Sequence, residues 1–260
     1  MNTVAIVGVG LIGGSFALAL RKAGFQGRII GVSSPATIHK AFSRGVIDEA
    51  LPLAEAASVA DLVYLSQPIS QIIETLKRLD TDALITDAGS TKAIICETAR
   101  KLKRGRFVGG HPMAGKESRG VEQADADLFR GRPYVLTSRE PELESWIDRI
   151  GSRLVLLEPA EHDRQVAFVS HLPQLLSTTL ASVLAGKEQV AGPAAADLTR
   201  LALSPYDIWR DIFATNAGPI DAAIGGFIGK LEELRTQLRS NEMEQAFTQA
   251  AASARALRGK

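Results

Sequence analysis

Near its N-terminus the chain reads Val4-Ala5-Ile6-Val7-Gly8-Val9-Gly10-Leu11-Ile12-Gly13, and this stretch decides the fold. Its first four residues form the short, β-branched-rich apolar run of a buried strand. A Gly-x-Gly-x-x-Gly pattern follows, and the next residues, which include Phe16 and Leu20, have helical spacing as far as Gly24. A second strand-like run, 28–32, comes next. The order strand, glycine-rich turn, helix and strand predicts a βαβ unit in a parallel sheet.

The glycine-rich turn in this position is typical of a dinucleotide site. Gly8 permits the tight turn, Gly10 lets the backbone approach a pyrophosphate, and Gly13 allows the helix to pack closely on the strand. The first helical residues, Leu11 and Ile12, place free N–H groups and the positive end of the helix dipole toward the phosphates. We therefore expect NAD or NADP to bind here, although such glycines also occur in purely structural turns.

The residue that closes the second strand usually reads the adenosine ribose, and an acidic residue there favours NAD. Here that position is Ser33, followed by Ser34 and Thr37. No acid at this position repels a 2′-phosphate. The hydroxyls, with nearby His39 and Lys40, can hydrogen-bond such a phosphate, so we expect the protein to use NADP, or both cofactors, rather than NAD alone. The alternative is that the two serines only cap the next helix. The expected cofactor-binding set is completed by two residues after the next predicted strand, Ser66 and Pro68.

The rest of the chain divides into two halves. Up to residue 158, short β-branched runs alternate with helical stretches, which predicts an α/β domain (1–158) with a Rossmann-type, doubly wound, mainly parallel sheet. Residues 159–260 are rich in Ala, Leu, Gln and Glu and predict an all-helical domain. The predicted strands are 4–7, 28–32, 62–65, 83–87, 107–110, 134–137 and 154–157.

The last helical stretches, 231–238 and 243–257, are amphipathic. A helical domain this small can hardly cover every apolar face by itself, so we expect it to dimerise the protein into a homodimer. The alternative is a self-contained bundle with solvated outer faces.

The composition favours a soluble protein with a small-molecule substrate. Among 260 residues, 30 Lys and Arg balance 29 Asp and Glu, and a net charge of +1 would recruit neither nucleic acid nor an anionic membrane. The sequence has no apolar run near the ~20 residues of a membrane span and no visible secretory signal, so we expect a cytoplasmic protein. A single cysteine, Cys96, excludes an internal disulfide and a multi-thiolate metal site, and we expect no metal.

Further segments carry residues suited to chemistry. One follows the predicted strand 83–87, at the sheet edge where ligands gather, and a second follows the strand 107–110. Others lie in the helical half. The segments are Asp87-Ala88-Gly89-Ser90-Thr91-Lys92, Gly109-Gly110-His111-Pro112-Met113-Ala114-Gly115-Lys116-Glu117, His162-Asp163, Ser170-His171-Leu172-Pro173-Gln174, Arg200 and Ser204-Pro205-Tyr206-Asp207-Ile208-Trp209-Arg210-Asp211.

These segments resemble those of the prephenate and arogenate dehydrogenases of tyrosine biosynthesis. The likeness covers almost the whole chain, and the HPMAG (111–115) and SHLP (170–173) segments are much more specific than the glycine pattern. The resemblance implies oxidative decarboxylation of a cyclohexadienol, arogenate and/or prephenate, to tyrosine and/or 4-hydroxyphenylpyruvate. A hydride leaves the ring carbon bearing the hydroxyl for the nicotinamide of NAD(P)+, the ring carboxylate departs as CO2, and the ring becomes aromatic.

The resemblance also implies two catalytic residues. His111 matches the residue that hydrogen-bonds the substrate hydroxyl and takes its proton, a task that suits an imidazole with an unperturbed pKa of about 6.5. Ser90 matches the serine between that hydroxyl and the nicotinamide, and an N-cap role for the following helix is its alternative.

We expect four more residues at the substrate site, of which two match binding positions of the family and two follow the HPMAG segment. Arg200 matches the arginine that binds the side-chain carboxylate, with a solvated surface arginine as the alternative. Trp209 matches the aromatic residue that the neighbouring subunit brings to the active site, with a core tryptophan as the alternative. Lys116 and Glu117 either help to gate the site or form an exposed ion pair.

The sequence departs from the family just after the SHLP segment. Many prephenate-using members have a second histidine where this chain has Gln174. Glutamine offers both a donor and an acceptor, and the acceptor can receive the ammonium of arogenate, so we favour arogenate or both substrates. For His171 we expect either a structural role or contact with the substrate.

Two other functions fit parts of the sequence. A β-hydroxyacid or imine reductase has the same architecture but normally uses a lysine in its helical half, and Lys187 and Lys230 have no supporting motif. A non-catalytic dinucleotide sensor would keep the glycine turn but has no use for His111, Ser90 and Arg200 together.

Overall fold

The chain was examined as a computed structural model that describes residues 1–116, 118–240 and 242–259. The decisive stretch forms the predicted βαβ unit, with β1 (Thr3–Val7), α1 (Leu11–Lys22) and β2 (Arg28–Val32). β1 and β2 pair in parallel register. α1 stops where Gly24 adopts a left-handed φ of 91°, which a residue with a side chain rarely takes.

Six parallel strands make up the main sheet in the order β3-β2-β1-β4-β5-β6, which confirms the doubly wound prediction. The order reverses between β1 and β4, so the carboxyl ends of these strands open a crevice where ligands bind in such sheets. β3 was not predicted, because its two residues are too few to show alternation. The other four strands are β3 (Glu49–Ala50), β4 (Leu62–Leu65), β5 (Leu84–Asp87) and β6 (Phe107–Val108).

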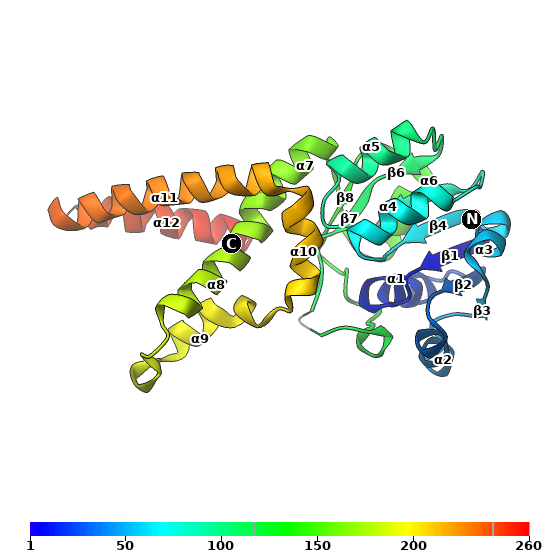
Figure 1. The fold of residues 1–260 in the computed structure, drawn as a ribbon, viewed down its shortest axis with the longest axis horizontal. Helices are drawn as coiled ribbons and strands as arrows, with labels where there is room; N and C mark the ends of the chain where they lie inside the picture. The colour runs from blue at the N-terminus through cyan, green and yellow to red at the C-terminus, as the bar shows by residue number, and fades with distance from the viewer. Residues whose placement is uncertain (117, 241, 260) are drawn as a thin grey trace.

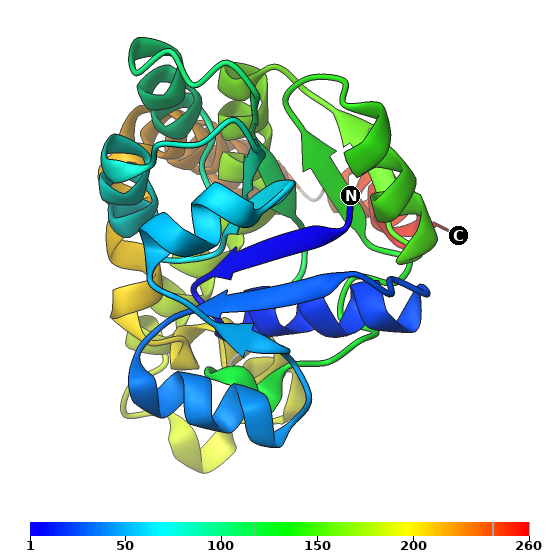
Figure 2. The same ribbon diagram turned by 90° about the vertical axis from the view of Figure 1, so that its right-hand side faces the viewer.

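Helices cover both faces of this sheet, as Figure 2 shows. Side chains alternate across β1, so Ile6 packs in one core with Phe16 of α1, and Val7 packs in the opposite core with Ile72 and Ile95. All five residues are at least 98% buried. The remaining helices of this region are α2 (Pro35–Ser43), α3 (Leu53–Val59), α4 (Ile69–Arg78), α5 (Ala93–Lys101), η1 (Val121–Gln123) and α6 (Pro141–Arg149).

The last predicted strands lie in a second sheet, where β7 (Gly110–Pro112) and β8 (Pro133–Leu136) pair antiparallel and β8 pairs parallel with β9 (Arg153–Leu156). The predicted strand 107–110 is therefore split at Gly109. A Cβ atom on Gly109 would lie 2.7 Å from the sulfur of Cys96, so only glycine lets the chain turn there against α5. This turn brings β7 to the carboxyl end of β5.

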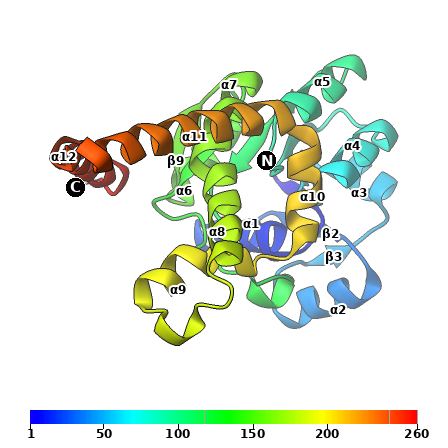
Figure 3. The ribbon, with the colours of Figure 1, turned by 60° about the vertical axis from the view of Figure 1, so that its left-hand side comes forward.

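The second half is helical throughout its described residues, as predicted (Figures 1 and 3). A long hairpin of α11 and α12 projects away from the sheets, and α10 lies between this half and the sheet domain (Figure 1). The elements are α7 (Pro159–Val166), η2 (Ala167–His171), α8 (Leu172–Val183), η3 (Glu188–Val190), α9 (Pro193–Thr199), η4 (Arg200–Leu203), α10 (Tyr206–Thr215), α11 (Ala217–Ser240) and α12 (Met243–Leu257).

The run from Pro159 to Val183 is one continuous helix that contains a π-helical turn, η2. By length and composition it is the one helix among the described residues that could cross a membrane, a test that the core helix of a soluble protein also passes. Here α7 packs on α5, and η2 packs on α11. π-Turns occur frequently at functional sites, because the extra residue shifts the phase of the side chains that follow.

Candidate active site

The glycine turn has the geometry that a pyrophosphate needs. Gly8 has a φ of +94°, and a Cβ atom on Gly13 would collide with the carbonyl of Gly8 and the hydroxyl of Ser66. A Cβ atom on Gly10, in contrast, would meet nothing within 4 Å, so open space lies beside the backbone at the point where α1 begins. Gly10 caps α1 without a side chain, and the first turn holds no acid that would oppose an anion. These residues fit a dinucleotide.

A groove leads away from this turn along the carboxyl ends of β1, β2 and β4. Its walls include most of the predicted cofactor residues, and Leu11 is a partly buried exception that packs into the core instead. The outer part of the groove is lined by Gly8, Gly10, Ser33, Ser34, Thr37, Ser66 and Pro68, and the inner part by Ile12, Ser66, Pro68, Gly89 and Ser90.

The outer end of the groove carries a hydroxyl cluster and one ion pair. Ser34 is the N-cap of α2, because its Oγ accepts from the backbone N–H of Thr37 at 3.4 Å, and it also lines the groove. Capping and ligand contact are therefore compatible at this residue. Lys40 Nζ, in the same wall, pairs with the carboxylate of Glu122 from η1.

The groove continues at Ser90 into a second pocket of about 460 Å³, a size typical of small-molecule sites. This pocket lies between the sheet domain and the helical half. The predicted site residues in its wall are Ser90, His111, Lys116, Gln174, Arg200 and Trp209.

A buried ion pair holds the two catalytic segments together. The Asp87 carboxylate at the end of β5 pairs with Lys92, and both side chains are fully buried. The same carboxylate accepts the N–H of Gly89 at 2.8 Å and of Gly110 at 3.2 Å, next to His111 on β7. Removing one partner of such a pair would leave an uncompensated buried charge. Asp87 therefore fixes the loop with Ser90 relative to the strand with His111.

Ser90 does not cap α5, which was the alternative role for this residue. α5 begins at Ala93, and its N-cap is Lys92. The first N–H groups of α5 are satisfied by Asp163 of α7, whose two carboxylate oxygens accept from Lys92 N at 2.6 Å and from Ala93 N at 2.9 Å. The Ser90 hydroxyl instead lies where the groove and the pocket meet.

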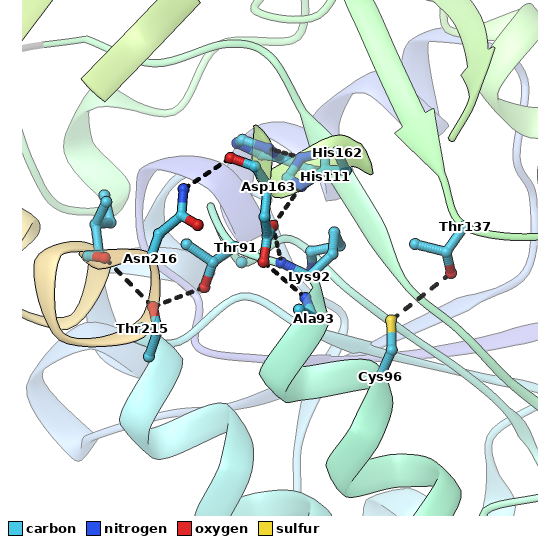
Figure 4. Close-up of polar contacts among 12 residues, drawn as sticks. Thr91, Lys92, Ala93, Cys96, His111, Thr137, His162, Asp163, Thr215 and Asn216 are labelled. Atoms are coloured by element: carbon cyan, nitrogen blue, oxygen red, sulfur yellow. Dashed lines mark hydrogen bonds and ion pairs between the residues drawn. The ribbon is translucent and has the colours of Figure 1, made fainter. Parts of the chain in front are cut away.

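His111 lies in the pocket wall with its ring 92% buried. Its Nδ1 contacts Nε2 of His162 at 2.8 Å, and Nδ1 of His162 contacts Asp163 at 2.7 Å (Figure 4). Burial, with the neighbouring His162 and Lys92, holds the pKa of His111 well below its ordinary value of 6.5. The ring is therefore neutral at neutral pH, as a proton acceptor must be.

Gln174 lines the pocket, is 96% buried and has its amide fixed in one orientation. Its Nε2 donates to the carbonyl of Leu201 at 2.9 Å and lies 3.3 Å from the hydroxyl of Thr178, which itself donates to the Gln174 backbone carbonyl. Both partners require a donor, so the amide orientation follows from them. Oε1 of Gln174 has no hydrogen-bond partner among the described residues. Gln174 therefore contributes an unused acceptor to the pocket wall.

His171 packs behind the pocket wall, against Trp209, which belongs to the wall. His171 is fully buried outside the pocket lining, with Nδ1 3.2 Å from the amide nitrogen of Asn216, an arrangement that fits the structural alternative. Burial lowers the pKa of His171 to about 4. Trp209 packs edge-on against His171, stacks on Phe213 and lines the pocket of its own chain, although the resemblance placed it in the neighbouring subunit's site.

Two cationic side chains lie at the pocket mouth. Arg200, on η4, is exposed and lines the wall, a position compatible with carboxylate binding. Lys116 pairs with Asp125 at 3.0 Å, so an ion pair exists, although with a partner other than the predicted one. Glu117, the predicted partner, lies outside the described residues.

The sequence analysis assigned no role to the direct partners of His111. His162 and Asp163 were noticed as a pair but received no role, because the contact between them and His111 spans 51 residues. Arg132, also in the pocket wall, lies next to β8 in a segment without a recognisable motif.

A dinucleotide groove that ends on a buried, neutral imidazole is the arrangement of an NAD(P)-dependent dehydrogenase, in which a base stands beside the hydride acceptor. Two family models match the chain: the nucleotide-binding domain of prephenate dehydrogenase over residues 16–160 and its dimerization domain over residues 158–250. The chain belongs to the prephenate dehydrogenase family.

Individual relatives agree with this assignment. The prephenate dehydrogenase of Lactococcus lactis is 35% identical over 94% of this chain and 73% of its own length. A crystal structure of prephenate dehydrogenase from Aquifex aeolicus, in complex with hydroxyphenyl propionate and NAD+, is 32% identical with a TM-score of 0.87 and covers 100% of this chain and 99% of that chain. The Synechocystis arogenate dehydrogenase structure is 30% identical with a TM-score of 0.80 and covers 99% of each chain.

Proposed function

We propose that this chain catalyses the oxidative decarboxylation of a cyclohexadienol, arogenate and/or prephenate, with NAD(P)+ as hydride acceptor. The observation that carries the proposal is the buried, neutral His111 in a pocket that joins the dinucleotide groove at Ser90. Family membership supports the same reaction.

In this reaction His111 takes the proton of the ring hydroxyl, and Ser90 orients that hydroxyl. When bound, the cofactor would accept the hydride from the ring carbon that bears this hydroxyl. The bond to the ring carboxylate then breaks, CO2 leaves, and the electron pair completes the aromatic ring. Because the product is a phenol, the proton returns from His111 to oxygen. Arg200 holds the side-chain carboxylate, and the enclosing pocket keeps the reacting groups in one orientation.

For the substrate we favour arogenate, or both substrates, because of Gln174. Its unpartnered Oε1 can accept a hydrogen bond from the ammonium of arogenate, whereas the keto oxygen of prephenate is a second acceptor. When a buried acceptor faces another acceptor, it stays without a hydrogen bond, and this costs about 1–3 kcal/mol of binding free energy.

For the cofactor we favour NADP, or dual use, over strict NAD. Ser33, Ser34 and Thr37 line the outer groove without an acid at the end of β2. Lys40 is within the same wall, although it is paired with Glu122, so a 2′-phosphate would have to share this lysine.

The remaining features of the proposed enzyme follow from the two halves. We place the domain boundary at residues 158/159 and expect a homodimer through the helical domain, in the cytoplasm, without a metal, nucleic acid or membrane partner. The reductase alternative has no support, since Lys187 donates to the Val183 carbonyl and Lys230 pairs with Glu233, both outside the pocket.

The test is a matrix of initial rates for reduced-cofactor formation, with arogenate or prephenate against NAD+ or NADP+. We expect turnover with at least arogenate, and the His111→Asn variant should lose about 100-fold or more in rate while its cofactor affinity stays unchanged. Absence of turnover in all four combinations would refute the proposal.

The substrate preference has its own variant. Gln174→His replaces the free acceptor by a ring that can donate to a keto or carboxylate oxygen, so kcat/KM should shift toward prephenate by roughly tenfold relative to arogenate. Thr178→Val, which removes a neighbour of Gln174 outside the pocket lining, is the matched control and should leave the ratio within about twofold. A shift toward arogenate in Gln174→His would contradict the assignment.

A further inference from the structure

Three side chains from two halves of the molecule form a line. His111 on β7 contacts His162 on α7, and His162 contacts Asp163 (Figure 4). His162 is fully buried and Asp163 is 97% buried. Neither lines the substrate pocket. His162 therefore reaches the pocket through its contact with His111.

The line has a fixed end at Asp163. Both of its carboxylate oxygens accept backbone N–H groups at the start of α5, from Lys92 and Ala93. The backbone carbonyl of Asp163 also accepts from the amide of Asn216 at 2.8 Å. An ionised carboxylate can only accept, and the positive end of a helix favours that charge. The atom of His162 that faces Asp163, Nδ1, must therefore carry a proton.

The proton on Nδ1 of His162 determines where the ring proton of His111 lies. With Nδ1 of His162 protonated in a neutral ring, its Nε2 is an acceptor, and Nδ1 of His111 must donate to it. The lone pair of His111 is then on Nε2, on the opposite side of the ring from His162. We propose that His162, fixed by Asp163, is a positioning residue that holds His111 in the tautomer with a protonated Nδ1, so that Nε2 is the basic atom.

The assignment rests on the proposed function for its kinetic consequence, although the tautomer exists in the resting protein. Once Nε2 has taken the substrate proton, Nδ1 still donates to His162, and the ring need not rotate or exchange a proton during the reaction. The negative charge of Asp163 lies at the far end of the same line and favours the imidazolium, while Lys92, itself paired with Asp87, opposes it.

The test reads the tautomer directly. The chain has four histidines, so uniformly 15N-histidine-labelled protein gives a two-bond 1H–15N spectrum that each single substitution can assign, with exposed His39→Gln as the reference variant. In the wild-type protein without ligands, we expect His111 to show a protonated Nδ1 and an unprotonated Nε2. Exchange of His162 by Leu should populate the other tautomer.

Kinetics separate positioning from packing. His162→Leu should lower kcat at least about tenfold with KM and cofactor affinity unchanged, and it should move the acid limb of the pH profile of kcat. His162→Gln, which restores an acceptor toward His111, should recover both the tautomer and most of the rate, so that simple destabilisation by Leu can be recognised.

Two results would overturn the assignment: a wild-type His111 with its proton on Nε2, or a His162→Leu variant that keeps both the tautomer and kcat. If the wild-type protein turned over none of the four substrate and cofactor pairs, the proposed function would fail, while the tautomer measurement would still decide the positioning role.

Discussion

At the scale of single residues, the chemistry depends on how few polar atoms the pocket leaves unpaired. Burial keeps His111 neutral, and the amide nitrogen of Gln174 already donates to Leu201, so that only the oxygen of this amide is left without a partner among the described residues. Each of these properties depends on residues distant in the sequence, His162 for His111 and Leu201 for Gln174. The identities of the site residues are visible in the sequence, whereas their protonation and orientation are set by distant neighbours.

The depressed pKa of His111 makes a prediction about pH. A base with a pKa below 6.5 stays unprotonated throughout the neutral range, so kcat/KM should be constant around neutrality and fall only at a pH well below 6.5. Besides burial, the groups that lower the pKa of His111 are His162, Lys92 and His171, and Asp163 lies beyond His162. The measurement is the pH profile of kcat/KM, and an apparent pKa of 6.5 or higher would contradict the prediction.

At the scale of helices and strands, the ends of elements define the site. Ser90 precedes α5, His111 lies on the short β7, and the line of contacts begins at the N-terminus of α5. The π-helical turn η2 then changes the phase of the long helix: before it, His162 contacts β7 and Asp163 contacts the start of α5, and after it Gln174 lines the pocket.

The capping of α5 by Asp163 predicts a large loss of stability on substitution. Asp163→Asn replaces one acceptor oxygen by a donor that faces N–H groups, which should cost about 2–3 kcal/mol and lower Tm by roughly 4–12 °C. Ser34→Ala, which removes an exposed N-cap at α2, is the control and should cost about 1 kcal/mol. Calorimetry of both variants measures the two losses in Tm. Equal losses would contradict the prediction that the buried cap at Asp163 contributes more stability than the exposed cap at Ser34.

The sequence predicted the elements better than it predicted their assembly. The period of the apolar residues and the glycine turn predicted the order of strands and helices, because these signals are local. The split at Gly109 and the second sheet were missed, since they depend on the contact of that glycine with Cys96 and Thr137. Likewise, His111 could be selected from its motif, but its contact with His162 requires the folded chain.

At the scale of the whole molecule, α12 buries none of its described residues within this chain. Large apolar side chains are exposed along the hairpin, including Leu238 at 68% and Phe247 at 69%. Exposed apolar surface of this kind marks an interface, and the family model that covers this half describes a dimerization domain.

The dimer can be tested on the hairpin. Phe247→Glu or Leu238→Glu places a charge in the apolar surface and should shift the protein toward monomer by at least about tenfold in dissociation constant, measured by sedimentation velocity. Gln249→Glu adds the same charge at an exposed polar position of α12 and should leave the dimer intact. A dimer of unchanged affinity in both charged variants would locate the interface elsewhere.

The line from His111 to Asp163 crosses from the sheet domain to the helical half, and its far end caps a helix of the sheet domain again. Domain exchange between relatives is therefore constrained here. A chimaera that joined this nucleotide-binding half to a foreign helical half would keep His111. It would lose His162 and Asp163, the residues that we propose fix the tautomer of His111. In a working chimaera, His162 and Asp163 would have to come from the same parent as β7 and α5, although they lie in different halves of the chain.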